Sequence, residues 1–466
     1  MHTTLPAAMG ALAVLGLASA GCDRGSSNDD SRDEADKRAQ HLPQEISWLE
    51  DDYPAALEAA RERGVPLVVV LWAPWCHTCL SMHNEVLPDP GLKPLATRFE
   101  WLMIDTDREV NAPVLDRLSI EVWPTSYVLS PDETVQARLT SAASVEQFRD
   151  FLLEGERAHL DAAEEAGELD EESPLYHARL GDRALAQNDY AAALDAYERA
   201  LELAPEAWPR TPDVLVSYMH ASMRAGTADD CAYIAQRHVH ETGTSTSAVR
   251  FSRYVHWCGQ GQATPSAQRG LFELADERLT DLLAGQHQLS ADDQSTALRT
   301  RRLIHEDLGD EDAARALAER QRELLDQAAE EAIGPFAAST YSWPRSEVYT
   351  YLGAPEELVP DLVELAEELP ENYDPPYRAA WLALRADDLE TARTWGERAQ
   401  ELAYGPRKVQ ILELLIEIHG EAGDRDAERA SLERLAEHLE SLPASQRDAD
   451  KATEVQERLQ AIADTE

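Results

Sequence analysis

Two hydrophobic periods alternate in the first part of the chain. From residue 46 onward, short apolar runs typical of β-strands alternate with segments whose apolar residues recur every three or four positions, as on one face of an α-helix. The run 67–72, with the sequence LVVVLW, is apolar throughout, which indicates a strand covered on both faces. We expect strands at 46–50, 67–72, 101–104, 125–129 and 134–139, and helices at 53–63, 81–87, 110–118 and 145–153. This β-α-β-α-β-α-β-β-α order predicts an α/β sandwich over residues 44–156.

The pattern changes after residue 158, where strand-like runs end and Ala, Leu, Glu and Arg dominate. Helix-breaking pairs divide this region at intervals of 34 to 48 residues, each with room for one helical hairpin. These pairs are Asn188-Asp189, Gly226-Thr227, Gly261-Gln262, Gly309-Asp310, Gly353-Ala354, Asp387-Asp388 and Gly423-Asp424. The sequence therefore predicts an all-α solenoid over residues 157–466.

The first of these units resembles the tetratricopeptide repeat. The residues that carry the resemblance are Leu180-Gly181, Ala184, Ala193, Tyr197, Ala200 and Pro205. Small residues recur four positions after the turn as Ala193, Cys231, Ala314 and Ala392, whereas Glu428 breaks this pattern in a later unit. The resemblance implies a concave face that often binds peptides or proteins. A scaffold that only packs against the first domain is the other interpretation.

The first residues are typical of a targeting segment. An apolar stretch over 5–20 ends in Ser19-Ala20-Gly21-Cys22, which resembles the bacterial lipoprotein signal. That resemblance implies cleavage after residue 21 and lipidation of Cys22, although Ser19 replaces the usual Leu and no Lys or Arg leads the segment. An ordinary cleaved signal and an uncleaved anchor are the alternatives. Each of these places the body outside the cytoplasm, and the lipoprotein interpretation makes it a membrane-anchored periplasmic protein.

The charge of the chain limits its partners. The sequence has 88 Asp and Glu against 42 Lys and Arg, a formal net charge of -46, so nucleic acid is not an expected partner. Residues 22–43 are polar and charged without apolar periodicity, and we expect them to be a disordered tether between the anchor and the folded part.

Two cysteines follow the apolar run 67–72 in the segment WAPWCHTC. Cys76 falls at the first turn of a predicted helix, where free N–H groups and the helix dipole stabilise a thiolate. Cys79 can reach back one turn, so Cys76 is the predicted nucleophile and Cys79 the resolving cysteine. His77 either adds positive charge beside the nucleophile or is a solvent-facing spacer. No second Cys-x-x-Cys is present, so we expect no metal, and dithiol–disulfide exchange needs no bound cofactor.

Residues 46–153 resemble the thioredoxin superfamily. One half of the signature is Trp75 with the two cysteines, and the other is Trp123-Pro124-Thr125, which resembles the family's cis-proline loop. Within the superfamily, the segment is most similar to the exported domains of thiol:disulfide interchange proteins. The resemblance implies a redox site that contains Trp75 and Pro124. The family's buried Asp is Val70 here, so proton transfer to and from Cys79 needs another route, for which Glu85 and water are candidates.

The remaining pair, Cys231 and Cys258, is expected to form a structural disulfide. A turn at 243–245 divides two helical stretches, and the two cysteines lie 12 residues before and 13 residues after it. Folding back the hairpin brings them level on inward-facing stripes. Two buried, unpaired cysteines are the alternative.

Together these features predict an extracytoplasmic oxidoreductase that exchanges disulfides with protein thiols through Cys76 and Cys79. The direction of electron flow and the upstream redox partner stay open. The rival hypothesis is a protein-binding adaptor in which the thioredoxin fold only supports the repeats.

Overall fold

The structure is a computed structural model that describes residues 45–163, 171–226, 228–285 and 289–463. All described residues belong to one compact unit of the chain. The predicted signal segment at 1–21, the tether at 22–43 and Cys22 lie outside the described residues. Among the described residues, no helix combines the length and the apolar character that crossing a bilayer requires.

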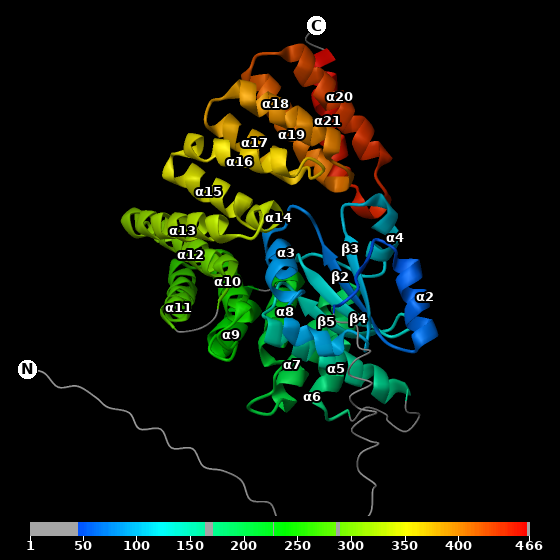
Figure 1. The fold of residues 1–466 in the computed structure, drawn as a ribbon. Helices are drawn as coiled ribbons and strands as arrows, with labels where there is room; N and C mark the ends of the chain where they lie inside the picture. The colour runs from blue at the N-terminus through cyan, green and yellow to red at the C-terminus, as the bar shows by residue number, and fades with distance from the viewer. Residues whose placement is uncertain (1–44, 164–170, 227, 286–288, 464–466) are drawn as a thin grey trace, which may run out of the picture. The chain divides into compact units, whose positions relative to one another are not determined.

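A five-stranded sheet forms the first part of this unit, in the order β1-β3-β2-β4-β5 (Figure 1). Its strands are β1 (Leu49–Glu50), β2 (Leu67–Trp72), β3 (Glu100–Asp105), β4 (Thr125–Leu129) and β5 (Val135–Thr140). The strands β1, β3 and β2 are parallel, whereas β4 and β5 are antiparallel to their neighbours. The central strand β2 is buried along almost its whole length, as its unbroken apolar run predicts.

Helices cover both faces of the sheet because the side chains of β2 alternate between them. Val68 and Val70 pack against the segment after the cysteines and against the closing helix. Val69 and Leu71 pack on the other face against the helix that follows β1. The covering elements are α2 (Tyr53–Arg63), α3 (His77–Ser81), η1 (Met82–Val86), η2 (Pro90–Leu95), η3 (Glu109–Asn111), α4 (Ala112–Leu115) and α5 (Val145–Ala163).

The predicted order of elements is confirmed, and some lengths differ. The helix expected over 81–87 begins earlier, as α3, and continues as the π-helical η1. The first strand is only β1, and the helix expected over 110–118 is reduced to η3 and α4. In contrast, α5 continues ten residues past the expected end at 153, so the predicted domain boundary between 156 and 157 falls inside one helix. Phe148 and Phe151 of α5 are fully buried against the sheet.

The rest of the described chain is helical. Its α-helices are α6 (Pro174–Ala186), α7 (Tyr190–Leu203), α8 (Thr211–Ala225), α9 (Ala228–His238), α10 (Thr246–Gln260), α11 (Pro265–Ala284), α12 (Ala291–Asp307), α13 (Glu311–Glu331), α14 (Pro335–Ala338), α15 (Ser342–Leu352), α16 (Val359–Glu368), α17 (Asp374–Arg385), α18 (Leu389–Leu402), α19 (Gly405–Glu421), α20 (Arg425–Ser441) and α21 (Ala449–Ala463). Short 3-10 turns, η4 (Ser339–Tyr341), η5 (Pro355–Glu357) and η6 (Ala444–Gln446), join some of them. Each of the seven predicted helix-breaking pairs lies between two helices, from α6 and α7 to α19 and α20, so the all-α class is confirmed.

Small residues allow close helix crossings in these hairpins. A side chain at Gly181 would collide with the ring of Tyr197 on the next helix. Ala193, Ala314 and Ala392, each four positions after a turn, are fully buried.

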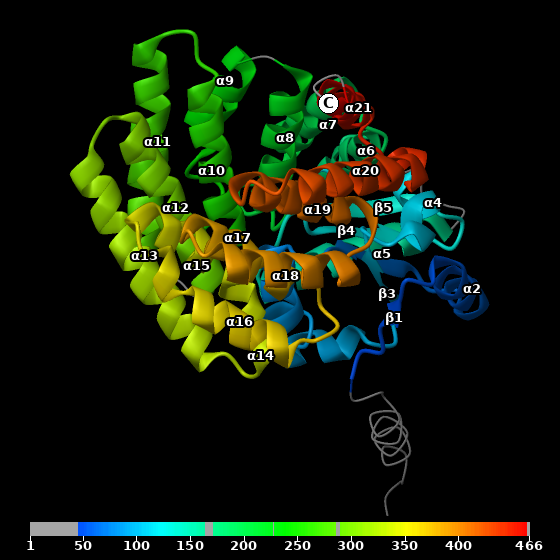
Figure 2. The same ribbon diagram turned by 90° about the horizontal axis from the view of Figure 1, so that it is seen from above.

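The helices form an arc whose inner side faces the sheet domain (Figure 2). At the start of the arc, Asp182 of α6 accepts a hydrogen bond from the backbone of Arg138 on β5. Near its end, the hydroxyl of Tyr404 donates to the Asp105 carboxylate at 2.5 Å, and Gln446 donates to the carbonyl of Thr106. Because both ends of the arc contact the sheet domain, the solenoid surrounds the side of that domain where the carboxyl ends of β2 and β3 lie.

Candidate active site

Cys76 occupies the N-cap of α3, directly after the turn that follows β2. The backbone N–H of Cys79 donates to Cys76 Sγ at 3.1 Å. The two cysteines form a disulfide, with Cα atoms 5.2 Å apart. One of the free N–H groups at the start of the helix, that of Cys79, therefore points at the sulfur that is the predicted nucleophile.

The proline loop lies beside this pair. The Trp123–Pro124 peptide bond is cis, as the resemblance implied. Thr78 links the loop to the sulfur, because its hydroxyl lies 3.2 Å from the Trp123 carbonyl and 3.3 Å from Cys76 Sγ. The hydroxyl has one proton, so it can donate to the carbonyl or to a thiolate at Cys76 but not fully to both. Sequence reasoning assigned no role to Thr78.

Two indoles flank the cysteines. The rings of Trp75 and Trp123 lie 5.3 Å apart, and both pack against Cys76 and Cys79. The indole N–H of Trp75 donates to the Asp107 carboxylate at 3.0 Å, and the hydroxyl of Tyr373 donates to the same oxygen at 2.6 Å. Burial raises the pKa of Asp107. Trp75 is thus held in place by a carboxylate that also ties the sheet domain to α17.

His77 is bound to the solenoid. Its Nδ1 lies 2.6 Å from the carboxylate of Asp292 on α12. A protonated His77 is therefore paired with a carboxylate, which offsets the positive charge that we expected it to offer the nucleophile. Glu85 also faces the solenoid, since it hydrogen-bonds to Tyr341, and burial raises its pKa.

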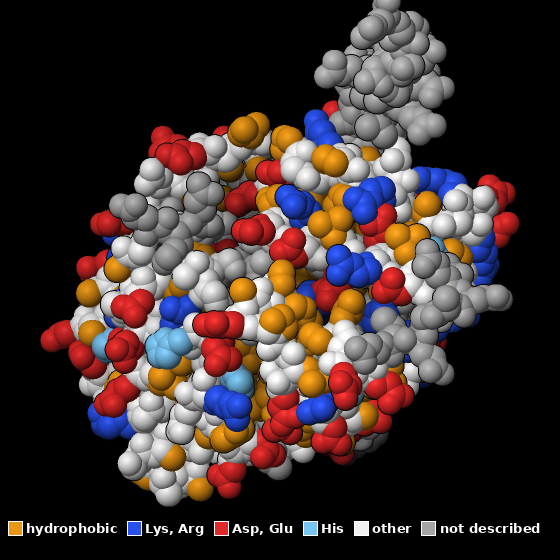
Figure 3. All heavy atoms as spheres, turned by 90° about the horizontal axis from the view of Figure 1, so that it is seen from below, with side chains coloured by type: hydrophobic (Ala, Val, Ile, Leu, Met, Phe, Trp, Pro, Cys, Tyr) orange, Lys and Arg blue, Asp and Glu red, His pale blue; other side chains and the backbone are white. Residues whose placement is uncertain are grey.

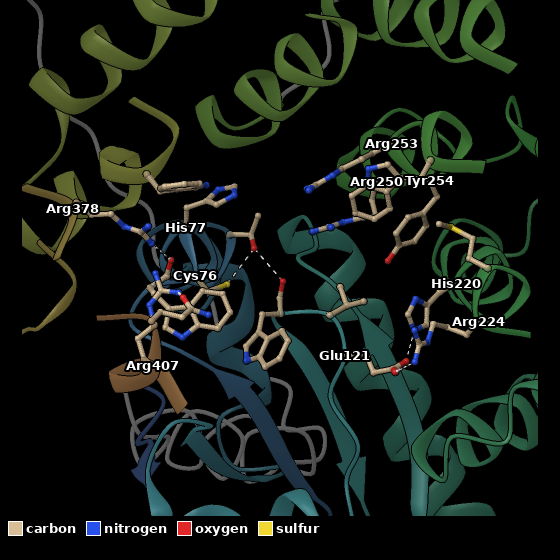
Figure 4. Close-up of a pocket in the computed structure, with 18 of the residues that line it drawn as sticks. Cys76, His77, Glu121, His220, Arg224, Arg250, Arg253, Tyr254, Arg378 and Arg407 are labelled. Carbon is tan, nitrogen blue, oxygen red and sulfur yellow. Dashed lines mark hydrogen bonds and ion pairs between the residues drawn. The ribbon is translucent and has the colours of Figure 1, made fainter. Parts of the chain in front are cut away.

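A cavity of about 610 Å³ opens in front of Cys76 (Figure 4). Its walls come from both parts of the unit: residues 75–78 and 121–123 on one side, and α8, α10, α15, α17 and α19 on the other. Aromatic side chains line much of it, namely Trp75, Trp123, Tyr254, Trp257, Trp343 and Tyr377. Arginines are the other main component, namely Arg224, Arg250, Arg253, Arg378 and Arg407. The arginines are far apart in the sequence, and none was among the predicted site residues.

Comparison with known proteins agrees with this geometry. Residues 48–131 match a family model described as Thioredoxin-like. Those residues form a thioredoxin-like domain.

Sequence relatives of this domain are distant. The chain is 29% identical over 94 residues to the thioredoxin-like protein CITRX, chloroplastic, of Solanum tuberosum, which is 20% of this chain and 50% of that protein. It is 35% identical over 72 residues to thioredoxin M4, chloroplastic, of Arabidopsis thaliana, which is 16% of this chain and 35% of that protein. The chain thus spans half or less of the length of these relatives.

Solved structures of tetratricopeptide repeat proteins are similar to the helical part. One from Parabacteroides merdae is 12% identical, covers 60% of this chain and 96% of its own, and has a TM-score of 0.39. Another from Thermus thermophilus is 20% identical, covers 46% of this chain and 100% of its own, and has a TM-score of 0.29.

The two cysteines for which a structural disulfide was predicted lie in the solenoid, outside the thioredoxin-like domain. A disulfide joins Cys231 of α9 to Cys258 of α10, with Cα atoms 6.1 Å apart. Both belong to an apolar cluster that includes Ile234, Phe251 and Val255. Among the described residues, no three His, Cys, Asp or Glu side chains are placed to hold a metal ion together.

Proposed function

We propose that this protein is a thiol–disulfide oxidoreductase that acts on protein thiols. The observation that carries the proposal is the Cys76–Cys79 disulfide at a helix N-cap, beside a cis-proline, in the wall of a cavity large enough for part of a peptide. The thioredoxin-like domain at 48–131 supports the same chemistry.

In the reducing direction, the Cys76 thiolate attacks one sulfur of a substrate disulfide. A mixed disulfide forms, and the other substrate sulfur leaves as a thiolate. The Cys79 thiolate then attacks Cys76 Sγ, which breaks the mixed disulfide and releases the second substrate thiolate. The substrate gains two electrons, and the protein loses them as its two thiolates become the Cys76–Cys79 disulfide. The same steps in reverse oxidise a substrate dithiol.

Trapping of the mixed disulfide tests this proposal. In Cys79→Ser the second attack is blocked, so Cys76 should stay joined to its substrates in the native host. Mass spectrometry after non-reducing electrophoresis identifies them, and Cys76→Ser/Cys79→Ser is the control. The wild type should also catalyse reduction of insulin by dithiothreitol. If the wild type is no faster than the double variant and nothing is trapped, the oxidoreductase proposal fails and the adaptor hypothesis gains.

We also propose that the chain works outside the cytoplasm, in the periplasm, as a lipoprotein anchored through Cys22. The support is the apolar segment that ends in Ser19-Ala20-Gly21-Cys22. Mass spectrometry of the mature N-terminus should find cleavage after Gly21 and acyl chains on Cys22. An intact segment, or cleavage elsewhere without acylation, would contradict the anchor.

A further inference from the structure

The cavity in front of Cys76 differs in charge from the rest of the molecule. Five arginines line it, and Glu121 is the one carboxylate among the described residues that do so. The chain as a whole has a formal charge of -46, and Figure 3 shows acidic side chains spread over the surface of one face. A cluster of arginines in so acidic a protein calls for an explanation. Unpaired arginines that are partly buried repel one another, so the cluster costs free energy unless an anion binds there.

Some of this positive charge is neutralised within the cavity wall. Arg378 forms an ion pair with Asp374 at 3.1 Å, and Arg224 forms one with Glu121 at 2.8 Å. Arg250 and Arg253, one turn apart on α10, form no hydrogen bond or ion pair with any described residue.

The position of Arg253 favours an anionic partner. Its guanidinium lies over the ring of Trp257, 4.5 Å from the centroid, and is therefore held at the wall. Burial, followed by the nearby charge of Arg250, lowers the pKa of Arg253 to about 9. An anion between the two arginines would remove this repulsion.

The space continues past the cysteine. A second cavity of about 600 Å³ shares Trp75, Trp123, Glu121, Arg407 and Gln410 with the first. It extends to the 3-10 turn η6, where Ser445 and Gln446 line it. The two spaces therefore adjoin at the indoles that flank Cys76. Two cavities that share this wall offer room for an extended chain on both sides of the indoles, which suits such a chain better than a compact small molecule.

We propose that the occupant is an extended, acidic peptide segment that carries the substrate cysteine, with its carboxylates bound by Arg250 and Arg253. This inference rests on the proposed function and specifies its substrate. Arginine recognises carboxylates through paired hydrogen bonds, and the aromatic walls take the apolar parts of such a segment. The negative outer surface does not prevent entry, because salt screens charges beyond about 8 Å at physiological ionic strength, whereas the arginines act at contact distance.

The rate of oxidation of the reduced full-length protein by peptide disulfides tests the proposal. Short peptides joined through one central cysteine, with Glu, Ser or Lys on both sides, are mixed with the reduced protein. Tryptophan fluorescence reports the reaction, since Trp72, Trp75 and Trp123 pack on the cysteines. We expect the Glu peptide to react about tenfold faster than the Ser peptide, and the Lys peptide to be slowest.

Variants assign the preference to the two arginines. In Arg250→Gln/Arg253→Gln the ratio of the Glu rate to the Ser rate should fall toward one. Arg250→Lys/Arg253→Lys keeps the charge and should retain most of the ratio, which separates charge from damage to the fold. Arg269→Gln, at an exposed position of α11, removes one positive charge elsewhere and should leave the ratio unchanged.

Three results would overturn the inference. Equal rates for the three peptides in the wild type exclude an acidic preference, although the proposed function survives. If oxidised glutathione reacts as fast as the Glu peptide at equal concentration, the site recognises a small anionic disulfide and not an extended peptide. If no peptide disulfide oxidises the Cys76–Cys79 pair, the proposed function itself fails.

Discussion

The described residues contain two disulfides whose cysteines are equally buried. Cys76 and Cys79 are 4% and 3% exposed, and Cys231 and Cys258 are also 4% and 3% exposed. Burial therefore does not distinguish a redox pair from a structural one in this protein. The difference lies in what surrounds the sulfurs and in how much chain each bond closes.

The surroundings differ in polarity and in space. Cys76 stands at a helix N-cap, within reach of the Thr78 hydroxyl, and lines a cavity with arginines in its wall. Cys231 and Cys258 belong to an apolar cluster between α9 and α10, and they lie 27 positions apart in sequence instead of three. A thiolate is stabilised in the first environment and destabilised in the second, so the two bonds should differ in reactivity and in contribution to stability.

The largest expected effect is on activity. Cys76→Ser should lower the rate of disulfide exchange by about 1000-fold or more, because it removes the attacking sulfur. The double variant Cys231→Ser/Cys258→Ser should keep the wild-type rate within about twofold at a temperature where it is folded. Insulin reduction measures both. A loss of activity in the folded Cys231→Ser/Cys258→Ser protein would show that the comparison between the two disulfides is wrong.

Stability should change in the opposite way. In the chain-entropy model, the loss of the Cys231–Cys258 bond costs about 3 to 4 kcal/mol of unfolding free energy, because the bond joins residues 27 positions apart and so closes a long loop. The short Cys76–Cys79 loop contributes about 2 kcal/mol in the same model. Urea unfolding of the two double-Ser variants compares them. A linked Cys231–Cys258 peptide after non-reducing digestion is the direct check, and alkylation of both cysteines in the denatured, unreduced protein would exclude the bond.

Local patterns predicted most of the fold. The bounds of α2, β2 and β4 agree with the sequence pattern, because an unbroken apolar run and a Gly-Val-Pro break act over a few residues. The turns of the solenoid were predictable for the same reason, since Gly, Asn and Asp tolerate the positive φ that Asn188 and Gly226 adopt.

Features that depend on distant contacts were not predictable. The arginines of the cavity come from helices spread over residues 224–407, and no local spacing links them. Asp292, which binds His77, lies 215 positions away, and the second contact of Thr78 exists only because the cis-proline loop folds beside it. The cysteine pair was readable from its motif, whereas the shape and charge of its cavity required the tertiary structure.

The stability of the region around the redox disulfide should also depend on pH. Asp105 lies at the end of β3, next to the redox site, where burial followed by the charge of Asp107 raises its pKa to about 7. The folded protein therefore holds a proton that the unfolded chain releases near pH 4, and stability falls as pH rises between these values. This carboxyl should remove roughly 2 kcal/mol of unfolding free energy between pH 5 and pH 7.

Asp105→Asn should flatten that slope, because the amide is neutral at every pH. Its one oxygen can still accept from the backbone N–H of Asp107, and its NH2 group can donate to the hydroxyl of Tyr404. Asp116→Asn, at an exposed position of the same domain, is the matched control. Urea unfolding at several pH values gives the slopes. Equal slopes in Asp105→Asn and in the wild type would exclude Asp105 as the source.

The smallest effect, and the finest test of the comparison, concerns Thr78. Its hydroxyl lies between the Trp123 carbonyl and Cys76 Sγ, so its proton can turn toward the sulfur when the thiolate forms. Thr78→Val keeps the shape of the side chain but removes this donor, and should slow the exchange by about tenfold, the loss of one charge-assisted hydrogen bond. Thr78→Ser retains the donor and should stay close to the wild type. Rates over a range of pH distinguish the two roles of the hydroxyl. If it stabilises the thiolate, the rate of Thr78→Val rises only at higher pH, whereas loss of the contact with the proline loop alone lowers the rate equally at every pH.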